Sequence, residues 1–265
     1  MNPLYRFGLA VSYVTCIPVC RLPADQEAGE LHGLSKYLPA VGLLIGALLL
    51  TIALGLRALQ TNQLTAGAVL ALSWLVITGG IHLDGLMDTA DGVFSHREQE
   101  RMLEIMADSR VGNFGAMTGF AVLIVKFASL SSLPFPALLP VLLLVPAWAR
   151  WCETYAIAAF PYLREAGMGK VWHQTTRHPL DPLLAGMLPV LATAAVWALG
   201  FRLSPLPAGF TILSGMGSAF YLVNILRGHT GDTYGAVVEL AEAAALLLTA
   251  LTINLPAIQQ AILAH

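Results

Sequence analysis

Long apolar stretches recur along nearly the whole chain and alternate with shorter polar connections. A helix needs about 20 apolar residues to cross a bilayer. The stretches that approach this length cover residues 3–20, 38–58, 63–90, 114–133, 135–159, 181–200, 205–226 and 236–256. The pattern therefore predicts an all-α, polytopic membrane helix bundle with about seven or eight membrane segments. Because Pro18 interrupts the first stretch, that segment is interpreted as either spanning, re-entrant or interfacial.

Composition agrees with a membrane protein. Hydrophobic residues make up 57% of the 265 residues and charged residues only 11%, whereas a soluble domain is about 25% charged. No long polar stretch separates the apolar segments, so we expect residues 1–265 to form a single integral-membrane domain with the lipid bilayer as its first partner. The net charge of −2 argues against nucleic acid as a partner.

Four longer polar connections, 21–37, 91–113, 160–180 and 227–235, are each separated from the next by two apolar segments. They should therefore lie on one face of the membrane. They hold most of the basic residues, namely Arg21, Lys36, Arg97, Arg101, Arg110, Arg164, Lys170, Arg177 and Arg227. The positive-inside rule makes this face cytoplasmic. None of the sixteen acids lies in a connection of the other face, so we predict a polar site facing the cytoplasm.

The most informative charged group is at the end of the third segment. Asp84, Asp88 and Asp91 are four and three residues apart, so on a helix they share one face. The three carboxylates repel each other, and placing one acid at mid-bilayer costs about 2.5–3.5 kcal/mol. Protonation, nearby arginines or a bound cation must offset these costs. Oxygen ligands without cysteine favour Mg²⁺. The alternative is a helix end whose acids are solvated.

A second polar group follows between residues 97 and 112. Arg97, Arg101, Glu104 and Asp108 recur at helical spacing, which predicts an amphipathic helix. Arg97, Arg101 and the nearby Arg110 either bind phosphate oxygens or form ordinary ion pairs with acids on the same helix. Asp108 follows this short helix and is a candidate fourth metal ligand.

The last segment also carries acids. Asp232 precedes it at a position typical of a helix N-cap, which is a sufficient structural reason for its presence. Glu239 and Glu242 face the same way inside the apolar segment, and ionisable residues in a membrane are functional candidates by default.

Lys126 and Arg150 are isolated basic residues inside apolar segments and either bind substrate or pair with an acid for structural reasons. His82 is off the aspartate face and is interpreted first as a hydrogen-bonded helix residue, with ligand and base as alternatives. Gly42 and Gly46 permit close helix packing, which leaves a homo-oligomer possible.

The motif from Gly79 to Gly92, Gly-Gly-Ile-His-Leu-Asp-Gly-Leu-Met-Asp-Thr-Ala-Asp-Gly, resembles the signature of the cobalamin synthase family, the adenosylcobinamide-GDP ribazoletransferases. Residues 101–110 and 230–242 are similar to further motifs of this family, as are Lys126, Arg150 and Gly167-Met168-Gly169. The resemblance implies a Mg²⁺-dependent enzyme of the bacterial cytoplasmic membrane. It would join adenosylcobinamide-GDP and α-ribazole, or its 5′-phosphate, to give adenosylcobalamin or its 5′-phosphate and GMP.

With this reaction in view, residues are assigned provisional roles. One or two Mg²⁺ ions would be held by Asp84, Asp88, Asp91 and Asp108. Phosphates or the nucleotide would be bound by Arg97, Arg101, Arg110 and Lys170, with His82, Lys126, Arg150, Asp232, Glu239 and Glu242 as further substrate-binding candidates. The proton of the attacking hydroxyl would go to Asp91 or Asp88, or else to Asp232 or Glu239.

Three other classes fit the aspartate spacing less well. CDP-alcohol phosphotransferases carry an Ala-Arg pair after their Asp-Gly that is missing here. Prenyltransferases of the UbiA type usually have a second aspartate motif, which is not evident. A divalent-cation transporter should have acids along several segments and at the far mouth, where this chain has none.

Overall fold

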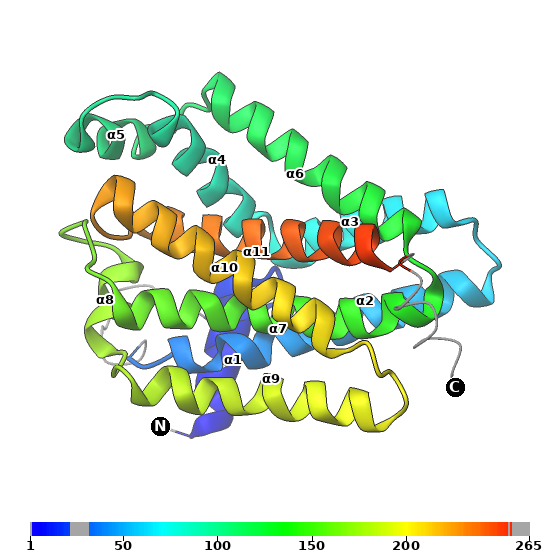
Figure 1. Cartoon of the computed structure of the whole chain (residues 1–265). Helices are drawn as coiled ribbons and strands as arrows, with labels where there is room; N and C mark the ends of the chain where they lie inside the picture. The colour runs from blue at the N-terminus through cyan, green and yellow to red at the C-terminus, as the bar shows by residue number, and fades with distance from the viewer. Residues whose placement is uncertain (1, 22–31, 254, 256–265) are drawn as a thin grey trace.

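The computed structural model describes residues 2–21, 32–253 and 255, and in these ranges every regular element is a helix (Figure 1). The elements are α1 Pro3–Val14, η1 Ser35–Tyr37, α2 Leu38–Ala58, α3 Gln63–Thr78, α4 Ile81–Val93, α5 Gln99–Met106, α6 Asn113–Ser132, α7 Phe135–Ala159, α8 Met168–Thr175, α9 Leu180–Ala198, α10 Pro205–Leu226 and α11 Gly231–Thr252. The all-α prediction is confirmed.

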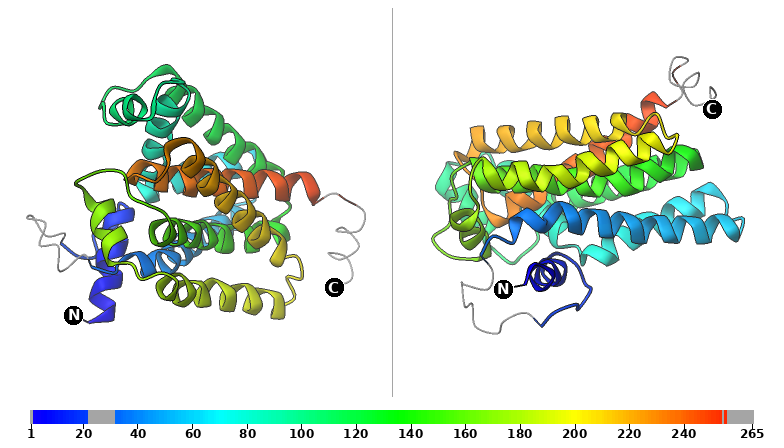
Figure 2. Two further views of the ribbon diagram at one scale, coloured as in Figure 1. Left: turned by 60° about the vertical axis from the view of Figure 1, so that its left-hand side comes forward. Right: turned by 90° about the horizontal axis from the view of Figure 1, so that it is seen from below.

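Six helices of the described part are long and apolar enough to cross a bilayer, and α3 with α4 makes a possible seventh as a broken pair. The first predicted segment, 3–20, is different. Its helix α1 has 12 residues and is about 18 Å long, which is too short to span about 30 Å of hydrocarbon. In Figure 2, α1 is seen end-on where the long helices run lengthwise, so it lies across the bundle.

The prediction of one continuous segment over 63–90 was wrong. The chain breaks between α3 and α4, whose axes differ by 88°. Gly79 and Gly80 both have left-handed backbone conformations, with φ of 62° and 69°. Glycine adopts this region without the steric cost that a Cβ brings, so two successive glycines end α3 and start α4 in a new direction. The aspartates therefore lie on a separate short helix.

The long helices pack around α7, which is buried over most of its length (Figure 1). Gly42 and Gly46 of α2 lie directly against the α7 backbone. A Cβ on Gly42 would approach Ala147 Cα to 2.6 Å, and one on Gly46 would approach Leu143 Cα to 2.8 Å. These glycines thus serve packing within the chain, and they supply no argument for a homo-oligomer.

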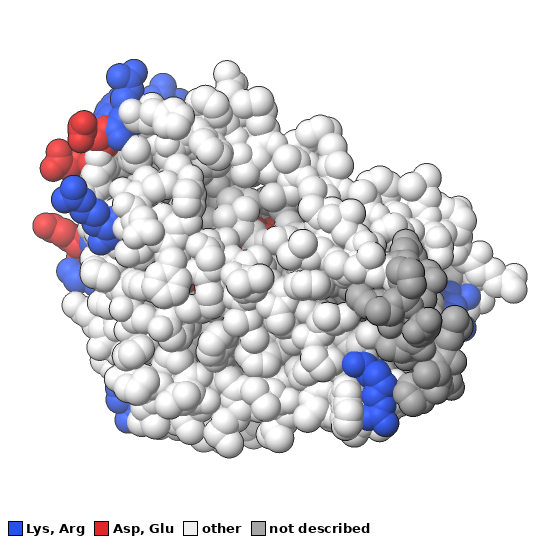
Figure 3. Space-filling model, viewed as in Figure 1, with Lys and Arg blue, Asp and Glu red and all other residues white. Residues whose placement is uncertain are grey.

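The polar connections meet at one end of the bundle, as the sequence predicted. The oxygens of Ser35 and Thr176 are 2.6 Å apart, which joins η1 to the end of α8. Leu163 N donates to His229 O, which joins the connection after α7 to the one before α11. Figure 3 shows charged side chains gathered at this end, and the residues 22–31 of the first connection lie outside the described residues.

Four charged side chains form a network in the middle of the bundle. Lys126 Nζ of α6 lies 2.7 Å from Glu239 and 2.6 Å from Glu242 of α11, and Arg150 Nη1 of α7 lies 2.7 Å from Glu242. All four are buried. Two positive and two negative charges balance. Lys126 and Arg150 are thus paired with acids, which is the structural alternative to substrate binding that the sequence left open. The network ties α6, α7 and α11 together.

We predict that Lys126→Met destabilises the protein by about 3–5 kcal/mol, because it leaves a buried negative charge without compensation. The double variant Lys126→Met/Glu239→Gln restores neutrality and should regain a large part of this loss. Unfolding of the purified proteins in detergent measures both effects. Equal destabilisation of the single and double variants would contradict the charge-balance argument.

Candidate active site

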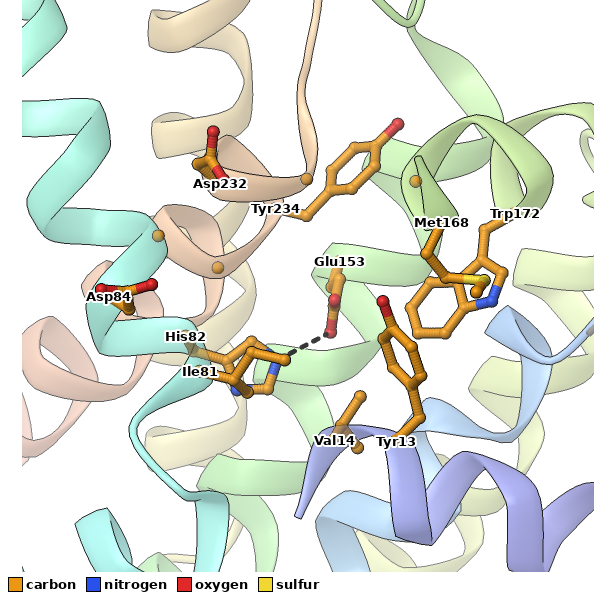
Figure 4. Close-up of a pocket in the computed structure, with 14 residues that line it drawn as sticks. Tyr13, Val14, Ile81, His82, Asp84, Glu153, Met168, Trp172, Asp232 and Tyr234 are labelled. Atoms are coloured by element: carbon orange, nitrogen blue, oxygen red, sulfur yellow. Dashed lines mark ion pairs between the residues drawn. The ribbon is translucent and has the colours of Figure 1, made fainter. Parts of the chain in front are cut away.

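A pocket of about 190 Å³ lies between α1, α4, α7, α8 and α11, and its lining includes the first residues of α8 and α11, which lie in two of the polar connections (Figure 4). Acidic side chains from α4 and α11 form one side of it, and aromatic side chains from α1, α8 and α11 form the other. Glu153 of α7 and His82 of α4 lie between the two sides.

The acidic side depends on a close contact between α4 and α11. A Cβ on Gly85 would come within 2.9 Å of Asp232 Cα, so only glycine lets the two backbones approach this closely. Asp84, next to Gly85, is exposed to the pocket, and Asp232 faces it from α11. Residues 148 positions apart in sequence thereby present two carboxylates to one space.

Asp232 is not the N-cap that the sequence predicted. Thr230 caps α11, in a reciprocal pair with Thr233, and Asp232 lies in the first helical turn. Its Oδ2 accepts a hydrogen bond from Arg164 Nη2 at 2.6 Å, and Arg164 also donates to Met106 O at the end of α5. Arg164 therefore connects the acidic side of the pocket to α5.

The three aspartates of α4 differ in their surroundings. Asp84 is exposed, Asp88 is half-buried and Asp91 is buried. Asp88 experiences the negative charges of Asp84, Asp232 and Asp91 and the positive charge of Arg164. Asp91 instead accepts hydrogen bonds from Gly112 N at 2.7 Å and Gly115 N at 2.8 Å. Asp91 thus anchors the start of α6, where backbone N–H groups otherwise lack partners.

Asp108 lies outside the pocket. It borders a separate surface groove together with Asp91, Arg101 and Arg110. Arg110 Nη2 lies 2.7 Å from Asp108 Oδ2, and this guanidinium lowers the pKa of Asp108 to about 2. The structure therefore does not bring Asp108 beside Asp84, which was the expectation for a fourth ligand.

Within the described ranges, no three carboxylate, imidazole or thiol groups converge closely enough to enclose a metal ion. Of the four expected ligands, Asp84 borders the pocket, and Asp91 and Asp108 border the groove. Asp84 and Asp88, one turn apart on α4, are left as a pair of oxygen donors. Mg²⁺ commonly binds one or two carboxylates and completes its coordination shell with phosphate oxygens and water. A pair of carboxylates agrees with this preference.

The predicted phosphate-binding residues are dispersed. Arg101 pairs with Glu104 at 2.6 Å on the exposed face of α5, the ordinary ion pair that the sequence left as an alternative. Arg97 is exposed just before α5. Lys170 lies in α8, and its Nζ donates a hydrogen bond to Glu165 O. None of these three lines the pocket.

His82 is buried in the pocket wall. Its Nε2 lies 3.7 Å from Glu153 Oε2 and its Nδ1 lies 3.5 Å from Arg150 Nη2. It therefore lies between the pocket and the buried charge network, and it borders the pocket as Asp84 does.

The aromatic side consists of Tyr13, Trp172 and Tyr234, with Met168 beside them (Figure 4). The ring centroids of Tyr13 and Trp172 are 5.0 Å apart. Burial raises the pKa of Tyr13 to about 12, with smaller effects of Tyr162 and Glu153, so the hydroxyl keeps its proton at neutral pH.

The family model described as cobalamin-5-phosphate synthase matches residues 6–250 of the chain. The chain belongs to this family. A relative from Thermosynechococcus vestitus, named adenosylcobinamide-GDP ribazoletransferase, is 41% identical over 96% of this chain and 99% of its own length. Two relatives of the same name are each 37% identical to this chain. The one from Roseiflexus sp. matches over 96% of this chain and 92% of its own length. The one from Desulfitobacterium hafniense matches over 93% of this chain and 97% of its own length. No solved structure matches the chain.

Membership of the cobalamin-5-phosphate synthase family confirms the resemblance seen in the Gly79–Gly92 motif. It also decides against the CDP-alcohol phosphotransferase, UbiA-type and transporter alternatives. The pocket contains residues that sequence reasoning did not select, namely Tyr13, Glu153, Trp172 and Tyr234. Glu153 carried a usable signal, since it is an acid within an apolar segment. The aromatic residues carried none, because aromatic side chains are common in membrane helices.

We predict that Asp91→Asn lowers the free energy of unfolding by about 1–3 kcal/mol. Asparagine offers one acceptor oxygen, so one of the Gly112 and Gly115 N–H groups loses its partner. Asp84→Asn is the matched control, because Asp84 is exposed. Unfolding midpoints in detergent compare the two, and equal stability of both variants would exclude an anchoring role for Asp91.

Proposed function

We propose that this chain is an adenosylcobinamide-GDP ribazoletransferase in cobalamin biosynthesis. It transfers the adenosylcobinamide phosphoryl group to the 3′-hydroxyl of α-ribazole or its 5′-phosphate, and GMP leaves. Family membership and the common name of the relatives support this activity. The structural observation that carries the proposal is the pocket in which Asp84 and Asp232 lie together on one side, opposite the aromatic side chains.

We propose Mg²⁺ as the cofactor, held by Asp84 and Asp88. When bound, the ion would neutralise charge on the diphosphate of the donor substrate. Both ligands are oxygen donors on one face of α4, in agreement with the preference of this ion. The roles first assigned to Asp91 and Asp108 in metal binding receive no support from their positions, since Asp91 binds the start of α6 and Asp108 binds Arg110.

The chain itself contributes positioning and proton transfer. Transfer of a phosphoryl group depends mainly on alignment and charge stabilisation. Among the candidates for the base, Asp91 accepts two backbone hydrogen bonds and Glu239 pairs with Lys126. We therefore assign the proton of the attacking hydroxyl to Asp232, whose carboxylate borders the pocket on the same side as Asp84. Arg164 holds Asp232 Oδ2 and fixes the direction of the carboxylate.

We also propose that the pocket faces the cytoplasm of a bacterial inner membrane. Arg101, Arg110 and Arg164 are at the polar end, whereas Arg57 lies in the last turn of α2 and Arg202 follows the end of α9. Positive charge concentrates on the cytoplasmic side of membrane proteins. A Glu100→Cys variant, with the natural cysteines changed to serine, should react with an impermeant maleimide in inverted vesicles and not in intact cells. The reverse labelling would overturn this orientation.

The activity is tested with purified protein, adenosylcobinamide-GDP, α-ribazole and Mg²⁺. We expect GMP and a cobamide in equal amounts by mass spectrometry, loss of both when the metal is chelated, and recovery when Mg²⁺ is returned. A folded sample that forms neither product would overturn the proposed function. Turnover that survives complete metal removal would overturn the cofactor.

Asp84→Asn should lower turnover by at least about a hundredfold, since it removes a charged ligand from the group that stabilises the diphosphate. Its stability should stay close to that of the unmodified protein. Glu100→Gln, which changes an exposed acid on α5, is the matched control and should keep full activity. Near-normal turnover of Asp84→Asn would exclude the metal assignment.

A further inference from the structure

The half of the pocket opposite Asp84 and Asp232 has a distinct chemistry. Tyr13, Trp172 and Tyr234 bring three aromatic rings from three helices to one side, and Asp84 and Asp232 lie on the other side (Figure 4). Aromatic side chains that border a polar cleft are suited to stack on flat heterocyclic rings. The phosphoryl transfer proposed above assigns no role to the aromatic residues.

Glu153 lies between the two sides, and its situation is unusual for a buried acid. The residue is 3% exposed, it lines the pocket, and its Oε2 has no hydrogen-bond partner among the described residues. His82 Nε2 lies 3.7 Å from this oxygen, which is beyond hydrogen-bond distance. A buried carboxylate oxygen without a donor is costly, so a ligand that supplies donors would be strongly preferred here.

Guanine supplies both features. Its ring is flat, and its Watson–Crick edge carries the N1–H and N2–H groups side by side, which together match the two oxygens of one carboxylate. Adenine has no N1–H, and xanthine has a carbonyl in place of the amino group. The dimethylbenzimidazole ring of α-ribazole has no N–H at all. Among the aromatic rings of the substrates, guanine alone satisfies Glu153.

We propose that the aromatic half of the pocket is the guanine subsite of the donor substrate, with Glu153 accepting hydrogen bonds from the N1–H and N2–H groups. This inference rests on the proposed function, because it takes the GDP part of the donor as the ligand. Bound in this way, the base lies beside Tyr13 and Trp172, and the diphosphate extends towards Asp84. GMP is then held at both of its ends.

Binding of free nucleotides tests the subsite without any variant. In calorimetry with Mg²⁺, we expect GMP to bind most tightly, IMP more weakly by about tenfold because it lacks the amino group, and AMP and XMP more weakly still. Equal affinity of GMP and AMP would overturn the inference. Turnover of adenosylcobinamide-GDP on the same sample separates the two proposals, since active protein without base preference leaves the proposed function intact.

Glu153→Gln should reverse part of this order. The glutamine amide can donate to the C2 carbonyl of xanthine and opposes the guanine donors, so GMP should lose about tenfold to a hundredfold in affinity and XMP should gain. Glu104→Gln, an exposed acid of α5 away from the pocket, is the control. A variant with reduced turnover but unchanged GMP and XMP affinity would assign Glu153 to the reacting groups and overturn its role in base recognition.

The aromatic wall is tested by Trp172→Leu, which removes a stacking surface and should weaken GMP about tenfold while ribose 5-phosphate, which has no base, is unaffected. Trp197→Leu is the matched control, because Trp197 is exposed on α9 and does not border the pocket. Equal loss of both ligands would show a general distortion of the pocket and would contradict stacking.

Discussion

The cost of an unpaired charge in an apolar bundle is the constraint on which the rest of the structure depends. Lys126, Arg150, Glu239 and Glu242 are tolerated only because they neutralise each other at 2.6–2.7 Å. Their positions fix α6, α7 and α11 relative to one another. Most of the remaining charged side chains gather where the polar connections meet, and residues of these connections border the pocket.

The two glycines between α3 and α4 give that end its chemistry. A continuous helix through residues 63–90 would carry the aspartates along the bundle axis. The 88° break turns α4 so that Gly85 packs on Asp232 and Asp84 faces the pocket. Gly79 and Gly80 therefore set the direction of α4, and Gly85 lets it approach α11 closely. The acids of the same motif have different surroundings. Asp84 faces the ligand space, whereas Asp91 supports the next helix.

The pocket combines two kinds of surface in one space. The acids and the aromatic rings are on opposite sides, with His82 and Glu153 between them. A nucleotide has the same polarity, with charged phosphate at one end and a flat base at the other. The connection from His82 through Arg150 to Glu242 means that this interior wall rests on the buried charge network.

The sequence by itself determined the helical class, the membrane character and the one-sided polar face, because each follows from local composition and spacing. It also selected Asp84 as a candidate site residue, and it offered pairing with an acid as the structural alternative for Lys126 and Arg150. Only the tertiary structure separated Asp91 and Asp108 from the pocket and brought Tyr13, Glu153 and Trp172 into it. Those outcomes depend on a backbone break and on contacts between helices far apart in sequence, and helical periodicity carries no information about either.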